Sequence, residues 1–418
     1  MSTNIAIKKI DSHLSSWPGR VEEIRKLLGA PGNPHLFPPH FLKSVFPKLG
    51  GHLFLVEKNG QDMGAAFLFP GNLNGQRLEY NLRWHQIDPH VPVSKDSLLT
   101  GIKKRMGACD LRFYAPGESY SFKKTAQEMA GFEFGCPDPE ESLKIRHLQK
   151  DIWGYHTAAD QDFLYPADIH STNFQPCSSL VVRKDGQVVG FLFGFFKFNH
   201  SPFPDLLRQK YLTGFRIESQ LLGVTPAFRG KNLGFLLKKA QAELVGDEGI
   251  DIINWTFDPL QSRNAVLNFC ELGGIAGQFF PEYYPFKNEL NQVPASRFGV
   301  TWLIRSVRVR KALTGHRRKI PHIASADDYR ILNDGYNMAN AAAGTPKIAI
   351  EIPSNWTRLQ REDLAAAAEW RRVTDEIFSR YVGFDKGKYL VTGVGWNKGK
   401  YFLIGERVDN NLLERLGL

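Results

Sequence analysis

The stretch that decides the fold lies at residues 221–234 and reads LLGVTPAFRGKNLG. Its first part is apolar and ends at Thr225-Pro226, a pair typical of the place where a strand stops. From Leu233 onward, leucine and alanine recur at helical spacing. The stretch therefore predicts a strand, a short turn and a helix over about residues 232–245.

The turn in this stretch is suited to holding an anion. Backbone N–H groups at the start of a helix lack helical partners, and the helix dipole is positive there. Gly230 and Gly234 allow close approach to the backbone, while Arg229 and Lys231 add positive charge. Residues 229–234 therefore predict a pyrophosphate site, with an ordinary strand-to-helix turn as the alternative.

The same stretch resembles the acetyl-CoA loop of the GNAT acyltransferases, whose pattern is Arg/Gln-x-x-Gly-x-Gly/Ala after a strand ending in Val-x-Pro. Val224, Pro226, Arg229 and Gly234 carry the match. Asn232 stands where the family usually has its middle glycine, and Asn tolerates unusual backbone angles better than most residues. Downstream, WTFDPLQSRNA at residues 255–265 is similar to a GNAT-like group of predicted acetyltransferases.

This resemblance implies acetyl-CoA or another acyl-CoA as co-substrate, with no metal. Ser262 occupies the usual position of an Asn that touches the pantetheine arm, and Asn264 is a nearby substitute. The implied cofactor-binding residues are Leu222, Gly223, Val224, Arg229, Gly230, Lys231, Asn232, Leu233, Gly234, Ser262 and Asn264.

The catalytic side chains are less well marked. Phe269 stands where many GNAT enzymes have the tyrosine that protonates the departing thiolate, and Phe has no proton to give. Tyr283 and Tyr284 are the nearest tyrosines in sequence and become the acid candidates. Glu218, on the strand leading into the loop, is the base candidate that the resemblance implies. The alternative for Glu218 is an exposed strand residue in a cross-strand ion pair.

An internal repeat organises the first three-quarters of the chain. Residues 55–64 and 181–190 match in character, and both predict a hairpin with a Lys-Asn/Asp-Gly turn. The first copy predicts a helix over residues 122–129. Its turn at residues 87–96 lacks the glycines and contains two prolines, which remove backbone donors, so we expect it to pack rather than to bind CoA.

The predicted fold class is α/β with a mixed sheet, as tandem GNAT-like domains. Residues 1–140 would be a degenerate GNAT-like domain, 141–305 the acyl-CoA-binding domain, and 306–418 a C-terminal α+β extension. In the second domain, Asp258-Pro259 predicts a helix start. The aromatic cluster at residues 279–285 is interpreted either as part of the wall of the acceptor site or as a packed loop. The extension predicts a strand at 347–352, a helix at 360–381, and strands at 389–394 and 401–405.

Composition sets broader limits. Hydrophobic residues make up 42% of the 418 and charged residues 23%, which argues against a disordered, fibrous or membrane protein. The net charge of +10 favours anionic partners without choosing among them. Residues 305–319 hold seven Lys or Arg and no acid, which fits a nucleic-acid patch or, more commonly, a linker or a cofactor-phosphate fringe.

The cysteines indicate a reducing environment. Cys109, Cys136, Cys177 and Cys270 form no CxxC pair, so we expect neither a zinc site nor disulfides. We therefore expect a cytoplasmic location.

The leading hypothesis is an acyl-CoA-dependent N-acyltransferase that acts on a small-molecule amine or a peptide. The alternatives are an aminoacyl-tRNA-dependent transferase, which the basic stretch favours mildly, and a non-catalytic CoA-binding sensor or scaffold, which Phe269 favours. The intact cofactor loop argues against the hypothesis of a tRNA-dependent transferase, so a nucleic-acid partner is not favoured. No membrane partner is expected.

Overall fold

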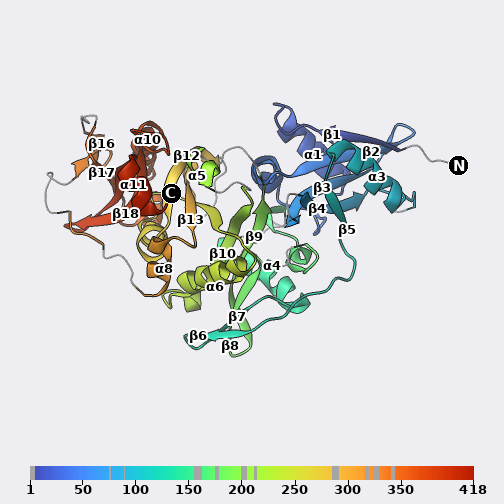
Figure 1. Ribbon diagram of the computed structural model, residues 1–418, viewed down its shortest axis with the longest axis horizontal. Helices are drawn as coiled ribbons and strands as arrows, with labels where there is room; N and C mark the ends of the chain where they lie inside the picture. Colours follow the sequence, from blue (N-terminus) through green and yellow to red (C-terminus); the bar gives the residue numbers. More distant parts are fainter. Residues whose placement is uncertain are drawn as a thin grey trace. The chain divides into compact units, whose positions relative to one another are not determined.

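The computed structural model describes residues 5–74, 77–88, 90–154, 162–174, 178–198, 205–210, 214–284, 291–315, 320–323, 329–339 and 344–418. Cys177, Pro285 and the end of the basic stretch, Arg317 to Lys319, lie outside these ranges. The chain divides into two compact units (Figure 1). The first comprises residues 1–203 and 212–244, and the second residues 204–211 and 245–418. This division runs through the predicted domain at 141–305, whose boundaries remain a prediction from the repeat.

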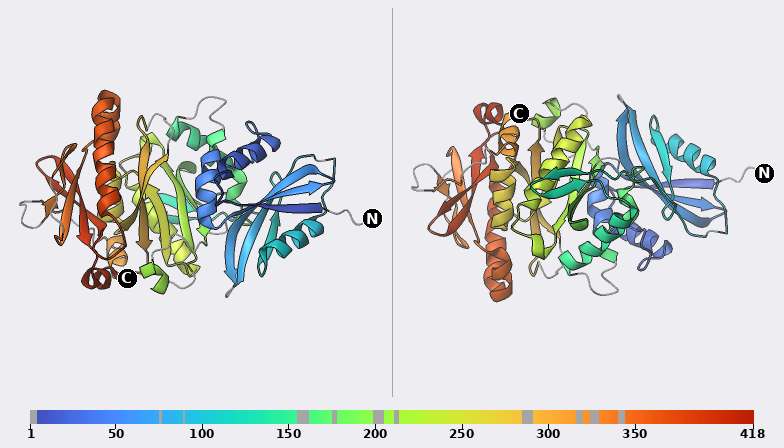
Figure 2. Two further views of the ribbon diagram at one scale, coloured as in Figure 1. Left: turned by 90° about the horizontal axis from the view of Figure 1, so that it is seen from above. Right: turned by 90° about the horizontal axis from the view of Figure 1, so that it is seen from below.

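The first unit begins with a five-stranded sheet in the order β1-β2-β3-β4-β5. Neighbouring strands are antiparallel, except that β4 and β5 are parallel and joined by α3. The elements are β1 (Ile5–Ile10), α1 (Trp17–Leu27), η1 (Phe41–Val45), α2 (Phe46–Leu49), β2 (His52–Lys58), β3 (Gln61–Asn74), β4 (Arg77–Gln86), α3 (Lys95–Met106) and β5 (Asp110–Tyr114). Helix α3 lies against one face of this sheet (Figure 2), where Leu98 and Ile102 are buried among strand residues.

A second set of strands in the first unit runs β6-β7-β8-β9-β10, each antiparallel to the next. Its elements are β6 (Gln127–Met129), β7 (Phe132–Gly135), α4 (Pro139–Trp153), η3 (Ala167–His170), β8 (Leu180–Lys184), β9 (Gln187–Lys197), β10 (Arg216–Val224), η4 (Pro226–Phe228) and α6 (Leu233–Asp247). Helix α4 starts with a capping box between Asp138 and Glu141 and ends at Gly154, whose φ is 74°.

The prediction of a helix over residues 122–129 is wrong. Its last three residues form β6, which pairs with β7 around a turn at Ala130 and Gly131 with φ of 54° and 75°. The hairpin forms instead because β7 also pairs with β8. The backbone groups of β6 and β7 thereby find hydrogen-bond partners on neighbouring strands.

The two matched hairpins share their geometry in detail. Both turns have two residues of positive φ, Asn59-Gly60 and Asp185-Gly186, as the sequence predicts for the glycines. Val56 faces Gly64, and Val182 faces Gly190, and each strand pair shifts register immediately after that valine. The same register and the same bulge in two places are what a repeat requires.

An aromatic core joins the two sheets of the first unit. It combines rings from the loop and helix before β2 with rings from β3, β9 and the segment around η3. Phe37 and Phe41 lie 5.0 Å apart between ring centroids, and Phe41 lies 4.9 Å from Phe195. Phe69 in turn lies 5.0 Å from Phe174. These side chains are almost fully buried, so the N-terminal sheet and the β6–β10 strands share one core.

The second unit has the strand order β11-β13-β12-β18-β19-β17-β14, with β15 and β16 paired separately. Its elements are α5 (Asp205–Lys210), β11 (Ile252–Phe257), α7 (Ser262–Ala265), η5 (Val266–Glu271), β12 (Ile275–Tyr284), β13 (Ala295–Leu303), α8 (Val307–Leu313), β14 (Arg330–Ile331), β15 (Asn333–Asp334), β16 (Asn337–Met338), β17 (Lys347–Ile352), α9 (Trp356–Glu362), α10 (Leu364–Tyr381), β18 (Tyr389–Asn397), β19 (Lys400–Arg407) and α11 (Asn410–Leu416). Helix α10 runs along these strands (Figure 2), and Phe378 packs on Phe279 and Phe298.

Three expectations for this unit need correction. The helix after β11 begins at Ser262 rather than at Asp258-Pro259, because Asp258 starts a turn in which its Oδ1 accepts from the Leu260 N–H and its carbonyl accepts from the Gln261 N–H. Residues 279–284 form the end of strand β12 and not a loop. The helix predicted over 360–381 is two helices, divided at Asp363, whose side chain caps α10 by accepting from the Ala366 N–H.

The basic stretch is only partly a linker. Arg305 forms an ion pair of 2.5 Å with Asp251, and α8 follows at once. Arg308 donates to the backbone carbonyls of Phe269, Gly273, Gly274 and Thr392, so its guanidinium is used inside the second unit. These two cations therefore have structural partners within the second unit. Among the described helices, none has the length and apolarity needed to span a membrane.

Candidate functional site

The predicted anion-binding turn joins β10 to α6. The Thr225 N–H donates to the Val189 carbonyl, and η4 then redirects the chain before α6 begins at Leu233. Gly230 and Asn232 have φ of 81° and 64°. Asn232 therefore adopts the left-handed conformation that its place in the motif requires, and Asn is the residue that does so at least cost after Gly.

The turn presents its charge to solvent. Arg229, Gly230, Lys231 and Asn232 are exposed, while Leu233 is buried and anchors the helix start. A side chain built at Gly230 would meet no atom within 4 Å, so the space beside this backbone is open. An open, positively charged turn at the start of a 15-residue helix is suited to a pyrophosphate.

The two cations of the turn have only weak protein partners. Arg229 Nε donates to the Val224 carbonyl at 3.3 Å, and Lys231 Nζ lies 4.9 Å from the centre of the Phe228 ring. Neither forms an ion pair with a described carboxylate. Their charge is therefore available to an anion.

The counterpart turn of the N-terminal sheet, before α3, is capped by the protein itself. Helix α3 is capped by its own Ser94, whose hydroxyl accepts from the Ser97 N–H at 3.4 Å. A protein group thus takes a donor that a phosphate would need.

Glu218 lies on β10, six residues before the strand ends. Its exposed fraction is 9%, and its Oε2 accepts a 2.8 Å hydrogen bond from Lys197 Nζ on β9. The structure therefore has the cross-strand ion pair of the alternative interpretation, but in a buried setting rather than an exposed one. No local sequence pattern indicates this pairing, because Lys197 lies 21 positions before Glu218 on a different strand.

Glu218 is surrounded by further cations. Burial lowers the pKa of Arg216 to about 10 and lowers the pKa of Lys197, with Glu218 opposing both shifts. Burial also lowers the pKa of Lys48, and Lys197 adds to that shift. Lys238, on α6, is 4% exposed and donates to Ser219 Oγ at 2.8 Å, and its burial holds its pKa well below the usual range. One carboxylate thus stands among four basic side chains.

The strand is irregular at this point. The register of β10 against β9 shifts between Ser219 and Leu221, so Gln220 is the extra residue of a bulge. Gln220 Nε2 donates to the Tyr165 hydroxyl at 3.0 Å. Beyond the bulge, Leu222, Gly223 and Val224 pair with Leu192, Phe191 and Gly190.

The remaining predicted cofactor residues belong to the second unit. Ser262 is buried and donates to the Ser354 carbonyl at 2.9 Å, so part of its hydrogen-bonding capacity is used by the C-terminal extension. Asn264 is exposed. Phe269 is fully buried, with its ring 5.6 Å from that of Phe257.

The two acid candidates lie next to each other on β12. The Tyr283 and Tyr284 rings are 4.9 Å apart, and the guanidinium of Arg297 lies 4.7 Å from the centre of the Tyr284 ring. Both side chains are partly exposed. The Arg297 guanidinium and the Tyr284 ring thus form a cation–π contact.

Residues 145–273 match the profile of a family described as the Acetyltransferase (GNAT) family. The chain carries a GNAT acetyltransferase domain. The match begins in α4 and ends at Gly273, just before β12. It includes Glu218 and the whole β10–α6 turn of the GNAT domain, but neither Tyr283 nor Tyr284.

Solved structures of GNAT proteins share limited similarity with the chain. Ard1 from Thermoplasma volcanium is 17% identical, with 41% of this chain and 97% of that chain covered and a TM-score of 0.30. The ribosomal-protein-S18-alanine N-acetyltransferase from Escherichia coli is 11% identical, with 41% and 92% covered and a TM-score of 0.29. Diaminobutyrate acetyltransferase EctA from Paenibacillus lautus is 14% identical, with 41% and 95% covered and a TM-score of 0.29. No curated protein is significantly similar to the chain in sequence.

Proposed function

We propose that the protein is an acyl-CoA-dependent N-acyltransferase, with acetyl-CoA as the favoured co-substrate and an amine as the acceptor. The observation that carries the proposal is the open, cationic β10–α6 turn, with Gly230 and Asn232 both at positive φ, inside the GNAT domain. Residues 229–234 would hold the pyrophosphate, and the backbone of residues 222–224 would align the pantetheine arm.

In the proposed reaction the neutral amine attacks the thioester carbonyl, the C–N bond forms, and the C–S bond breaks as the thiolate leaves. The amine loses a proton to a base, and the thiolate takes one from solvent or from a tyrosine. Positioning and stabilisation of the oxyanion supply most of the rate in such a transfer. Glu218 is the proposed base, acting through water, and Tyr283 or Tyr284 the proposed acid.

The contact with Lys197 bears on the proposed role of Glu218. The Glu218 carboxylate already accepts a hydrogen bond from the buried Lys197 ammonium, so one of its oxygens is engaged within the protein. This favours a second candidate, a CoA-binding sensor or scaffold, in which the buried Phe269 and the paired Glu218 have no catalytic duty. The tRNA-dependent alternative gains nothing from Arg305 and Arg308, since both have protein partners.

The deciding experiment separates binding from turnover. Calorimetry with CoA and acetyl-CoA tests the turn, and release of free CoA thiol in the presence of an amine panel tests the transfer. The panel includes free amino acids, polyamines and peptides with different N-termini. Binding with transfer supports the acyltransferase, binding without transfer to any amine supports the sensor, and no binding of either nucleotide contradicts both.

The repeat and the location complete the proposal. The shared register and bulge of the two hairpins support tandem GNAT-like halves divided near residue 140. The C-terminal extension from residue 306 would then complete the second half, because β18 pairs with β12 at Val391 and Ala276. We also propose a cytoplasmic location, because the cysteines are widely spaced in the sequence.

A further inference from the structure

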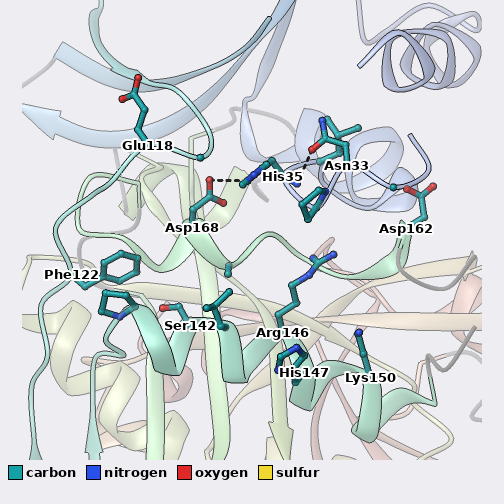
Figure 3. A pocket seen from close by; sticks show the side chains of 17 residues that line it. Asn33, His35, Glu118, Phe122, Ser142, Arg146, His147, Lys150, Asp162 and Asp168 are labelled. Atoms are coloured by element: carbon teal, nitrogen blue, oxygen red, sulfur yellow. Dashed lines mark hydrogen bonds and ion pairs between the residues drawn. The ribbon is translucent and has the colours of Figure 1, made fainter. Parts of the chain in front are cut away.

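A cavity of about 720 Å³ lies in the first unit, apart from the cofactor turn. It is bounded by α4 on one side and by residues 32–36 and 117–122 of the N-terminal half on the other (Figure 3). Asp168 of η3 and Asp162 complete the wall. None of residues 222–234 lines it. Its volume is in the range of small-molecule sites, so both halves of the chain contribute to a second candidate ligand site.

Helix α4 presents three basic side chains to this cavity. Arg146, His147 and Lys150 are one and four positions apart, which places them along one side of the helix. Arg146 Nη1 donates to the carbonyls of Leu164 and Tyr165, at 3.2 and 2.8 Å, which fixes its guanidinium at the wall. Within the described part of the chain, none of the three forms an ion pair with a carboxylate.

The two aspartates that line the cavity already pair with buried arginines of the protein. Asp168 is held by both terminal nitrogens of the fully buried Arg83, each at 3.1 Å. Burial opposes ionisation there, but Arg83 and His35 still hold the pKa of Asp168 well below its usual range. Asp162 pairs with Arg25, which is 1% exposed. The charges left unmatched at the surface of the cavity are therefore mainly those of α4.

The rest of the wall separates a charged end from an apolar one. Glu118 is exposed, accepts from the Tyr120 hydroxyl at 3.1 Å, and points away from Arg146 and Lys150 in Figure 3. Phe122 and Leu143 both line the cavity, and Leu143, on α4, has an exposed fraction of 56%. These two side chains supply the apolar surface that an apolar ligand group could contact.

We propose that this cavity binds a small organic anion, with its carboxylate or phosphate held by Arg146 and Lys150 and its apolar body against Leu143 and Phe122. The planar guanidinium suits both head groups, and Lys150 adds a second positive charge one turn along α4. The inference goes beyond the proposed acyl transfer, because it assigns a ligand to a different place in the first unit. It also gives the N-terminal half a role as one wall of a binding site.

The test uses three ring compounds of similar shape on the full chain. Phenylacetate carries a carboxylate, phenyl phosphate a phosphate, and phenylacetamide no charge. We expect calorimetry to show that at least one anion binds about tenfold or more tightly than phenylacetamide, with binding that weakens as salt is raised. The stronger of the two anions identifies the head group. Absence of binding of both anions at about 10 mM overturns the proposal, as does equal binding of phenylacetamide.

Two charge reversals on α4 locate the site. Lys150→Glu removes a cation of the cavity and should weaken anion binding about tenfold or more. Lys144→Glu is the matched control, because Lys144 lies on the same helix but pairs with Glu140 and does not line the cavity. His147→Gln adds a milder change at the cavity without reversing charge. If Lys150→Glu and Lys144→Glu have the same effect on anion affinity, the anion does not bind here. CoA affinity should be unchanged in all three variants, which separates this site from the cofactor turn.

Discussion

Lys197 Nζ donates a hydrogen bond of 2.8 Å to Glu218 Oε2, across neighbouring antiparallel strands and with both side chains buried. The two residues are diagonal rather than directly opposite, since Lys197 faces Arg216 and Glu218 faces Phe195. The pair lies just before the bulge and the cofactor turn. The proposed base of the GNAT domain thus also raises the pKa of four buried or half-buried basic groups, against the lowering effect of their burial.

Removing the two partners of this pair should have unequal costs. Glu218→Gln leaves several buried cations without their carboxylate, whereas Lys197→Met leaves Glu218 with Arg216 nearby. Breaking a buried pair typically costs about 3–5 kcal/mol of unfolding free energy, and we expect Glu218→Gln at the upper end and Lys197→Met below it. Urea unfolding of the single variants and the double variant checks this. Equal costs would mean that the surrounding cations do not depend on Glu218.

The same variants test catalysis. If Glu218 is the base, Lys197→Met removes the ammonium that donates to it, so the acidic limb of the pH–rate profile of acyl transfer should move. This readout survives even if Glu218→Gln proves too unstable to assay. An acidic limb that stays in place in Lys197→Met would remove Glu218 from the mechanism.

Arg229→Glu should weaken CoA binding without loss of stability. Arg229 is exposed and makes only one long hydrogen bond within the protein, so its removal costs the fold little. Loss of a charge-assisted contact to phosphate is worth about 1.5–3 kcal/mol of binding free energy. Calorimetry with CoA measures the affinity, and a thermal melt is the control. CoA affinity equal to that of the parent would refute the assignment of the pyrophosphate to this turn.

Arg371→Met should destabilise the second unit far more than Arg372→Met. Arg371 is 6% exposed and donates to the buried Asp258 at 2.6 Å, which ties α10 to the chain after β11. Arg372, the next residue, has a largely exposed side chain paired with Glu369 and Glu376. We expect a loss of about 3–5 kcal/mol for the first and within about 0.5 kcal/mol for the second. Similar midpoints in urea unfolding would show that the Asp258–Arg371 pair is not important for stability.

Asp375 should make stability fall between mildly acidic and neutral pH. Burial raises its pKa to about 6, although Arg371 and the Ser296 hydroxyl oppose the shift. Because the folded-state pKa exceeds the unfolded one of about 3.9, its stabilising contribution is complete below the unfolded value and is lost as pH rises through about 6. Asp375→Asn cannot ionise and should therefore flatten this dependence by about 2–3 kcal/mol.

Unfolding curves at pH 4, 6 and 8 for the parent and Asp375→Asn provide the measurement. The difference in unfolding free energy between the two proteins should change in favour of the variant from pH 4 to pH 8. A difference that is the same at all three pH values would mean that Asp375 titrates in the folded protein as it does in the unfolded chain.

The sequence by itself determined the features that short segments specify. The hairpin turns at Asn59-Gly60 and Asp185-Gly186, the β10–α6 turn and strand β17 all follow from residues adjacent in the chain, because turn chemistry and helix starts are local. It also identified the GNAT resemblance that the family comparison shares. The helix predicted at 122–129 failed because its last residues pair with β7, which is itself held by β8 much further along the chain, and this strand pairing outweighs local preference.

Tertiary structure alone decided which partners the functional candidates have. Glu218 meets Lys197 across 21 positions of sequence, and Asp258 meets Arg371 across 113, and no local pattern records either contact. The cavity over Arg146 and Lys150 likewise needs walls from residues 32–36 and 117–122. Charges buried together fix one another's ionisation only once folding has brought them within a few ångströms and removed the water between them, so their roles cannot be read from residue spacing.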